Sequence, residues 1–336
     1  MIKKRARISD IADRVGVSNA TVSRAISGSG YVKEELAERI RAVAIDMDYG
    51  IARDFRGLKI VLAVSNDAVI DLQRSQFTMH VVQGIRDRAD ALGIDLEHVQ
   101  FKDEQSFEKL TKLAETDDVI GTLILTIEDD LLKAVTHLKG DVVLVNSDDP
   151  DMRLHSVTPC NRSAAALAAR HLIELGHERI LFINKPGRRT IQRRLEGMRD
   201  AMGVRFDPAL VVAAKDWTIE AGQKALETAL AKELDFTAVI AAGDVLGAGA
   251  IIALQAAELS IPDQVAVVGI DGLPQNEFLS PQLTTVAIPM LDVGAQSVDM
   301  VCDCYLRAGG SGHLPVRRLE LGCTLQVRGS TSKKLQ

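Results

Sequence analysis

Short apolar runs alternate with longer segments of helical periodicity along most of this 336-residue chain. Three of these runs are Lys59–Ser65, Val119–Leu125 and 142–146, and amphipathic segments separate them. Strands that alternate with helices predict a parallel sheet whose two faces are covered by the helices. Aromatic residues make up only 4% of the chain, so we expect cores built of Ala, Val, Ile and Leu.

The same alternation begins again after Asn161, so the chain contains two repeats, at 59–160 and 161–288. Two repeats predict two similar lobes, each with its own parallel sheet. Ligands of open parallel sheets bind beyond the carboxyl ends of the strands. Two such edges that face one another would enclose a small molecule and could close on it by a hinge motion.

Several polar side chains fall at predicted strand ends or on the helices that follow them. Asn146 and Asp271 each end a strand, and Trp217, the single tryptophan, lies between a strand and a helix. An aromatic face beside carboxylate, amide and guanidinium groups suits a polyhydroxylated or anionic small molecule. The alternatives are core packing for Trp217 and an exposed loop acid for Asp271. The predicted effector-binding residues are Ser65, Asn146, Arg194, Trp217, Asp244 and Asp271.

The first fifty residues have a different pattern, that of three short helices. Apolar residues recur at the spacing of one helix face in 8–15, and a glycine then interrupts the pattern. Ser18 fits the N-cap of a second helix, Asn19–Ser27, and a third helix follows at 33–49. Two short helices joined by a glycine-containing turn form a helix-turn-helix unit.

The outward face of the second helix carries side chains that can read DNA. A helix fits the major groove, where its N-terminal residues meet base edges. Asn19 can pair with adenine, Arg24 can pair with guanine, and Ala20 can contact a thymine methyl group. Hydroxyl groups and basic side chains suit phosphates, which position the protein without specifying a sequence. The alternative is an ordinary solvated surface. The predicted DNA-contacting residues of this region are Ser9, Ser18, Asn19, Ala20, Thr21, Ser23 and Arg24.

The charge distribution also favours nucleic-acid contact through the N-terminal region. The formal net charge is −6, yet the first sixty residues hold 12 Lys and Arg against 8 Asp and Glu. An acidic body with a small basic head is typical of such contact. The basic N-terminus is not followed by an apolar stretch, and no run of about 18 apolar residues occurs. We therefore expect a cytoplasmic, nucleoid-associated protein that does not contact a membrane.

Two other classes of protein share features of this sequence. A solute-binding protein would use the same two lobes, but the basic head and the missing signal peptide argue against it. A nucleotide-dependent enzyme is suggested by Gly247-Ala248-Gly249, which lacks the third glycine of the dinucleotide fingerprint. The histidines have no metal-ligand spacing, and four cysteines are too sparse for a disulfide scaffold. We expect no enzymatic activity, no cofactor and no metal site.

The segment 8–28, with its core Val-Gly-Val-Ser-x-x-Thr-Val-Ser-Arg, closely resembles the DNA-binding head of the lactose-repressor (LacI/GalR) family. The resemblance implies that Asn19–Ser27 is the recognition helix and that Asn19, Ala20 and Arg24 occupy base-reading positions. It extends over nearly the whole chain. Arg194 resembles the arginine of the family's Arg-x-x-Gly segment, and Asp271 the aspartate of its Val-Gly-x-Asp strand end. Both of those residues contact the effector in the family.

The chain departs from the family in the segment after the head. Ala52 and Arg53 match the family's hinge helix, and Phe55 occupies the place of its minor-groove leucine. The Pro-Asn pair that precedes this helix in the family is missing, and the linker is about three residues short. The resemblance implies that Arg53 and Phe55 contact DNA, with Phe55 as an apolar wedge in a base step. The alternative is a plain linker.

Two further departures concern the effector site. Gly243-Asp244 stands where the family often has Asn-Asp, and Cys160-Asn161 stands where it has Asp-Asn. A basic cluster suggests an acidic or phosphorylated sugar-like effector, with a solvated loop as the alternative. Its members are Lys185, Arg188, Arg189, Arg193 and Arg194.

We therefore expect an all-α helix-turn-helix head at 1–49, a hinge at 50–58 and a two-lobed α/β domain of the periplasmic-binding-protein-like type I fold at 59–331. The first lobe would comprise 59–160 and about 290–322, and the second 161–289. The expected function is transcriptional regulation, most simply repression, by a homodimer on double-stranded operator DNA. A sugar, sugar acid or sugar phosphate bound between the lobes would control operator affinity allosterically.

Overall fold

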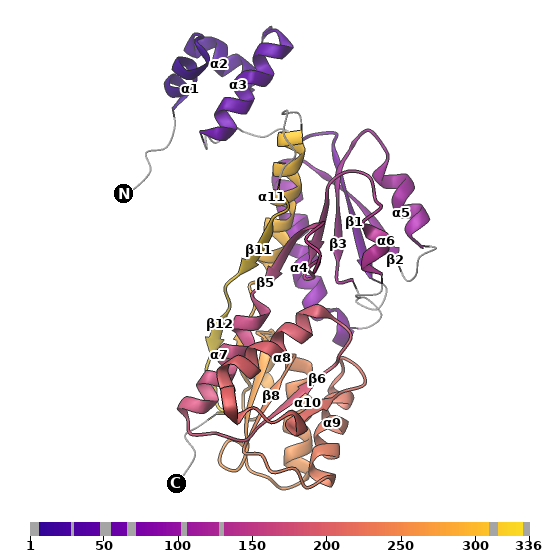
Figure 1. The fold of residues 1–336 in the computed structure, drawn as a ribbon, viewed down its shortest axis with the longest axis vertical. Coiled ribbons are helices and arrows are strands. Elements are labelled where there is room, and N and C mark those ends of the chain that lie inside the picture. The colour runs from indigo at the N-terminus through magenta and orange to yellow at the C-terminus, as the bar shows by residue number, and fades with distance from the viewer. Residues whose placement is uncertain are drawn as a thin grey trace.

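The computed structural model describes residues 7–27, 30–47, 55–65, 72–101, 106–127, 131–308 and 315–331. Within these residues the chain forms a three-helix head followed by two α/β lobes, each built on a six-stranded sheet (Figure 1). This arrangement confirms the predicted fold class. Of the helices described, none is both long and apolar enough to pass through a lipid bilayer.

The head consists of α1 (Ile8–Val15), α2 (Asn19–Ser27) and α3 (Glu34–Asp46). The predicted boundaries of α2 are confirmed, and the backbone N–H of Thr21 donates to the Ser18 hydroxyl at 3.1 Å, as expected of an N-cap. The three helices bury one small apolar core, which consists of Ile11, Ala12, Val15, Val22, Ala25, Ala37, Ile40 and Ala44.

The sheet of the first lobe has the strand order β11-β5-β4-β3-β1-β2, and all of its pairings are parallel. Its strands are β1 (Lys59–Ser65), β2 (Asp95–Phe101), β3 (Val119–Leu125), β4 (Val142–Val145), β5 (His155–Pro159) and β11 (Arg318–Leu321). Its helices are α4 (Leu72–Leu92), α5 (Ser106–Ala114), α6 (Leu132–Val135) and α11 (Met290–Ala308).

Both faces of the first sheet are covered. On β1, Ile60 and Leu62 join the apolar cluster that contains Ile85 of α4, and α4 packs against α11. The alternate β1 residues, Val61 and Ala63, join the separate cluster that lies under α5 and α6. Burial on both faces explains why these strands are continuous apolar runs rather than alternating ones.

The sheet of the second lobe has the order β12-β10-β9-β8-β6-β7 and is parallel except for β12, which is antiparallel to β10. Its strands are β6 (Ile180–Asn184), β7 (Val211–Ala213), β8 (Ala238–Ala241), β9 (Ala266–Asp271), β10 (Thr284–Ala287) and β12 (Thr324–Gln326). Its helices are α7 (Asn161–Glu174), α8 (Arg189–Met202), α9 (Ile219–Ala231) and α10 (Asp244–Ala256), with short 3-10 helices at Gly203–Arg205, Pro208–Leu210 and Pro274–Phe278.

The chain passes between the two sheets three times. The passages join β5 to α7, β10 to α11 and β11 to β12. The first and third passages are held together by a hydrogen bond from the Cys160 backbone N–H to the Leu321 carbonyl at 2.8 Å. Because β12 pairs with β10, the chain beyond residue 322 also contributes to the second sheet, which the predicted range 161–289 omitted.

The glycines that suggested a dinucleotide motif have a packing role. Gly247 and Gly249 lie inside α10 and not in a loop after a strand. A Cβ atom on Gly249 would collide with the backbone of α9 at the Ile219 carbonyl. The absence of side chains therefore lets α9 and α10 approach closely, and these residues do not form a phosphate-binding turn.

Candidate DNA-binding surface and effector site

The exposed face of α2 carries four of the predicted DNA-contacting residues. Asn19, Ala20, Ser23 and Arg24 are exposed, while the opposite face of the helix is buried in the head core. Ser18 is exposed but accepts the capping hydrogen bond, and its hydroxyl lies 2.9 Å from that of Thr21. Ser9 lies on α1 and Thr21 on α2, and both are partly buried. The face thus offers an amide, a methyl group and a guanidinium to a groove.

Two arginines of α3 hold the other helices of the head in place. Arg39 donates from Nη2 to the Val15 carbonyl at 2.7 Å, and Arg41 donates from Nε to the Ala25 carbonyl at 3.3 Å. These are carbonyls of the last turns of α1 and α2, which have no partner within their own helices. The contacts join residues 16 and 24 positions apart, so the helical pattern could not reveal them.

The structure corrects the prediction for Phe55. Its side chain is 2% exposed and belongs to the apolar cluster that contains Ile60 and Leu62. The backbone N–H of Leu58 donates to the Phe55 carbonyl at 3.0 Å, so a turn leads directly into β1. A wedge between base pairs must be accessible, so Phe55 in this position cannot serve as one. Burial of the large aromatic ring in the apolar core stabilises the position that Phe55 takes in the structure. Arg53 lies outside the described residues.

In the second lobe, Arg194 of α8 connects the carboxyl ends of two strands with the start of α7. Its Nε donates to Asn161 Oδ1 at 2.8 Å. Its Nη1 donates to the carbonyl of Ala242, just after β8, and lies 3.3 Å from Asp271 Oδ1 at the end of β9. Arg194 is only 4% exposed. The predicted pair Arg194 and Asp271 is therefore brought together at the sheet edge where ligands of such folds bind.

Trp217 and Asp271 both lie close to Gly243. A Cβ atom on Gly243 would lie 2.9 Å from Trp217 Cζ3 and 3.3 Å from Asp271 Oδ2. The glycine that departs from the family pattern therefore makes room for the indole ring. Trp217 Nε1 and Asn146 Oδ1 are buried, and neither has a hydrogen-bond partner within the described residues. A buried donor and a buried acceptor without partners are costly, and both belong to predicted effector residues.

The Asp271 carboxyl is held close to its titration point at neutral pH. Burial raises its pKa from the ordinary value near 3.8 to about 7, and the neighbouring Asp244 carboxylate adds to the rise. The Arg194 guanidinium opposes the shift but does not cancel it. The backbone of Asp271 has φ +147°, which is uncommon for a residue with a side chain. The site can therefore present either a carboxylate or a carboxylic acid to a ligand.

Asp244 has a structural role, which corrects its predicted contact with the effector. Its side chain is 1% exposed. Oδ2 accepts hydrogen bonds from the backbone N–H groups of Gly272 (2.7 Å) and Leu273 (2.8 Å) and from Asn276 Nδ2 (2.7 Å). Oδ1 accepts one from the Thr285 hydroxyl at 2.6 Å. These contacts fix the loop that follows Asp271 and leave the carboxylate no position for a ligand.

The remaining effector predictions have mixed outcomes. Ser65 ends β1 and is buried, and the residues that follow it, 66–71, lie outside the described part of the chain. Of the basic cluster, Arg193 pairs with Asp148 at 2.6 Å and Arg194 with Asp271 at 3.3 Å. Asp148 also pairs with Arg189, so these three arginines contact acidic side chains of the protein and are not free for a ligand.

One group of potential metal ligands is close together in space but far apart in the sequence. The ligating atoms of Asp141, His155 and Cys304 lie within 4.8 Å of one another. However, His155 Nδ1 accepts a hydrogen bond from the Arg317 backbone N–H at 3.0 Å, which places the ring proton on Nε2. The Arg317 guanidinium also lies 3.4 Å from Cys304 Sγ. A proton on Nε2 and an adjacent cation both oppose metal binding, so this group is a structural polar network.

A small helical head with an exposed recognition helix, joined to two lobes with a polar site at their strand ends, defines a ligand-responsive DNA-binding regulator. Residues 7–50 match the model of bacterial regulatory proteins of the lacI family, and residues 169–331 match the periplasmic binding protein-like domain. The chain thus joins a DNA-binding domain of the lacI family to a periplasmic binding protein-like domain, and its homologues include regulators of that family. It is a transcriptional regulator and not an enzyme.

Relatives extend this likeness over the full chain. The transcriptional repressor CytR of Escherichia coli (strain K12) is 28% identical over 338 residues, which cover 97% of this chain and 96% of CytR. The ribose operon repressor of Halalkalibacterium halodurans is 28% identical, with 96% of each chain covered. The solved structure of the transcriptional regulator CelR in complex with cellobiose has a TM-score of 0.72 and 29% identity, covering 97% of this chain and 100% of that chain. The lac repressor dimer bound to operator shares the fold, with a TM-score of 0.71, 22% identity and coverage of 98% and 100%.

Proposed function

We propose that this protein is a homodimeric repressor that binds operator DNA through α2 and senses an uncharged, polyhydroxylated small molecule between the strand ends of the two lobes. The exposed face of α2 supports the first half of this proposal. It carries Asn19, Ala20 and Arg24 on a helix fixed by its cap and by Arg41. A dimer would place two such helices in successive major grooves of a palindromic site.

The observation that carries the second half is the pair of unpartnered polar atoms, Trp217 Nε1 and Asn146 Oδ1. One is a donor and the other an acceptor, and a hydroxyl group can satisfy either. The indole ring of Trp217 suits the apolar face of a sugar ring. Arg193 and Arg194 already pair with acidic residues, so neither guanidinium is free to hold an acidic or phosphorylated ligand. The cellobiose complex of the relative CelR supports a sugar.

In this scheme the ligand bridges the lobes through Trp217 and Asn146, and thereby changes their relative placement. Because α2 precedes the first lobe, such a change alters the spacing of the two heads in the dimer and hence operator affinity. Linkage requires that DNA change ligand affinity by the same factor. A protein that acts on chromosomal DNA works in the cytoplasm, at the nucleoid.

Calorimetric titration with matched ligands tests the ligand class. We would titrate a panel of neutral sugars and, in parallel, the corresponding sugar acids and sugar phosphates. Neutral members should bind, and Trp217→Phe, which keeps an aromatic ring but removes the N–H group, should weaken binding about tenfold. Tight binding of charged members alone would refute the proposed ligand class and leave the DNA-binding role intact.

A further inference from the structure

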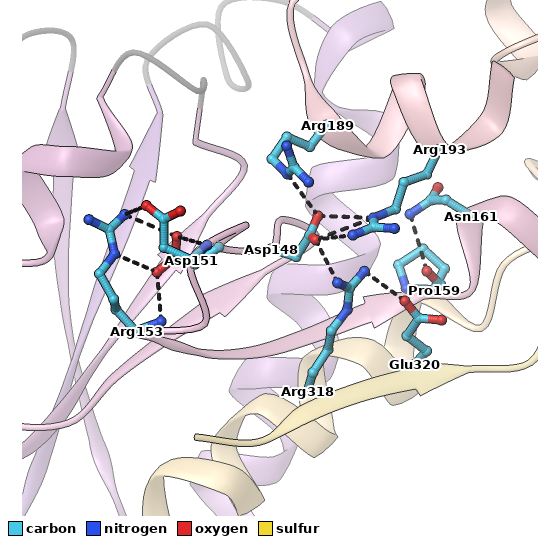
Figure 2. Close-up of polar contacts among 10 residues, drawn as sticks. Asp148, Asp151, Arg153, Pro159, Asn161, Arg189, Arg193, Arg318 and Glu320 are labelled. Carbon is cyan, nitrogen blue, oxygen red and sulfur yellow. Dashed lines mark hydrogen bonds and ion pairs between the residues drawn. The ribbon is translucent and has the colours of Figure 1, made fainter. Parts of the chain in front are cut away.

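A buried carboxylate in the first lobe is surrounded by three arginines (Figure 2). Asp148 lies in the loop between β4 and β5, and its side chain is 1% exposed. Arg193 Nη2 lies 2.6 Å from Asp148 Oδ2, and Arg318 Nη1 lies 2.7 Å from the same oxygen. Arg189 Nε lies 3.6 Å from Oδ1. We call these four residues the Asp148 cluster.

The members of the Asp148 cluster come from both lobes. Asp148 belongs to the first lobe, whereas Arg189 and Arg193 project from α8 of the second lobe (Figure 2). Arg318 begins β11, the edge strand that precedes the third passage between the sheets. The cluster therefore joins the lobes through side chains, in addition to the three backbone passages.

The stability of the Asp148 cluster depends on the charge of one group, the Asp148 carboxylate. Three guanidinium groups converge on one carboxylate. Glu320 lies 2.8 Å from Arg318, and Glu196 interacts electrostatically with Arg193. Removal of one partner from a buried ionic group leaves the others uncompensated, which is strongly destabilising. Loss of the Asp148 charge would leave three arginines close together, with Glu196 and Glu320 as their acidic neighbours.

The cluster is also adjacent to the proposed effector site. Arg193 and Arg194 are neighbours on α8, and Arg194 contacts Asn161 and Asp271. A movement of α8 that follows a ligand at Arg194 therefore also moves Arg193 relative to Asp148. This coupling rests on the proposed function, whereas the ionic contact between the lobes does not.

We propose that the Asp148 cluster is an ionic clamp between the lobes. Its three arginines form an anion-binding cradle, and the Asp148 carboxylate of the protein itself fills that cradle. A free oxyanion such as inorganic phosphate has the same chemistry as the carboxylate, because arginine pairs with both through two parallel hydrogen bonds. The cradle accepts such an anion when the Asp148 charge is absent.

The test is chemical rescue of Asp148→Asn by inorganic phosphate. Thermal unfolding and hydrogen–deuterium exchange are measured in chloride and in phosphate at equal ionic strength. In chloride, the variant should melt at a lower temperature and exchange several-fold faster in both 189–202 and 318–321. Phosphate should restore both properties in this variant and have a much smaller effect on the unmodified protein. The double variant Asp148→Asn/Arg193→Gln should show no such recovery.

Asp200→Asn is the matched control, because Asp200 forms an exposed ion pair with Arg162 within the second lobe alone. If Asp148→Asn behaves like this control, or if faster exchange is confined to 147–153, the clamp is refuted. Equal stabilisation of all variants by phosphate refutes the cradle. If Asp148→Asn does not fold, Arg193→Gln provides the test, since it removes the strongest contact and leaves Asp148 paired. It should then speed exchange in 189–202, and unchanged exchange there would overturn the proposal.

Discussion

Arg194 of α8 and Asp271 at the end of β9 form a buried ion pair in which Nη1 and Oδ1 are 3.3 Å apart. The pair joins a helix to a strand end within the second lobe, beside the only tryptophan of the chain. The proposed ligand site and the stability of the second lobe therefore share the same charged groups.

The raised pKa of Asp271 predicts a pH-dependent stability. The folded-state pKa of about 7 exceeds the ordinary value near 3.8, so the folded protein binds more protons than the unfolded chain between these values. The stabilisation is fully present below the ordinary value and is lost as pH rises through about 7. Urea unfolding at pH 5 to 8 should show a falling free energy of unfolding. Asp271→Asn should flatten this slope, and an unchanged slope would assign it to another group.

Gly243 should be intolerant of a side chain. A Cβ atom there would lie 2.9 Å from Trp217 Cζ3, so Gly243→Ala must displace the indole ring, at a cost of about 1–3 kcal/mol. Because Trp217 is the single tryptophan, its fluorescence emission reports the displacement directly. Gly322→Ala is the control, since a Cβ atom on Gly322 meets open space. Identical emission spectra for both variants would contradict the proposed contact.

Arg24 should read a base and not only a phosphate. Arg24→Ala should cost about 1–3 kcal/mol of operator affinity and relax the preference at one base pair in each half-site. Selection from a randomised DNA library followed by affinity measurements would detect both effects. Lys33→Ala removes the same charge from an exposed position outside α2 and should leave sequence preference intact. A uniform loss of affinity for all sequences with Arg24→Ala would show a phosphate contact instead.

Phe55 should contribute to stability without DNA. Phe55→Ala should lower the free energy of unfolding by about 3–5 kcal/mol, because it removes a buried ring from the core under β1. Chemical denaturation of the DNA-free protein measures this loss. Should Phe55→Ala unfold like the unmodified protein and lose only operator affinity, the side chain is a DNA contact after all.

The elements that are predictable from the sequence are those with a local signal. The apolar runs of β1 and β3 and the cap at Ser18 are local signals, and the structure confirms these elements. Sequence patterns did not predict strands β5, β10, β11 and β12, because polar residues interrupt the apolar run in each of them. Such segments become strands because distant partners, such as β10 for β12, supply the hydrogen bonds.

The candidate site was predictable only in part, for a similar reason. The sequence pattern locates strand ends and helix faces, and Arg194, Asp271 and Trp217 lie at or near such positions. The saturation of Asp244 by four hydrogen bonds depends on side chains and loops up to 41 positions away. The pairing of Asp148 with Arg193 and Arg318 likewise joins segments that no local rule connects.

The three passages of the chain between the sheets limit how the halves of the sensor can move. A single connecting peptide would act as a swivel, free to turn in any direction. Several connections side by side resist twisting and leave bending as the easiest deformation. The three connections thus set the direction in which one lobe can move relative to the other. The chemistry of the bound molecule decides only the size of that movement.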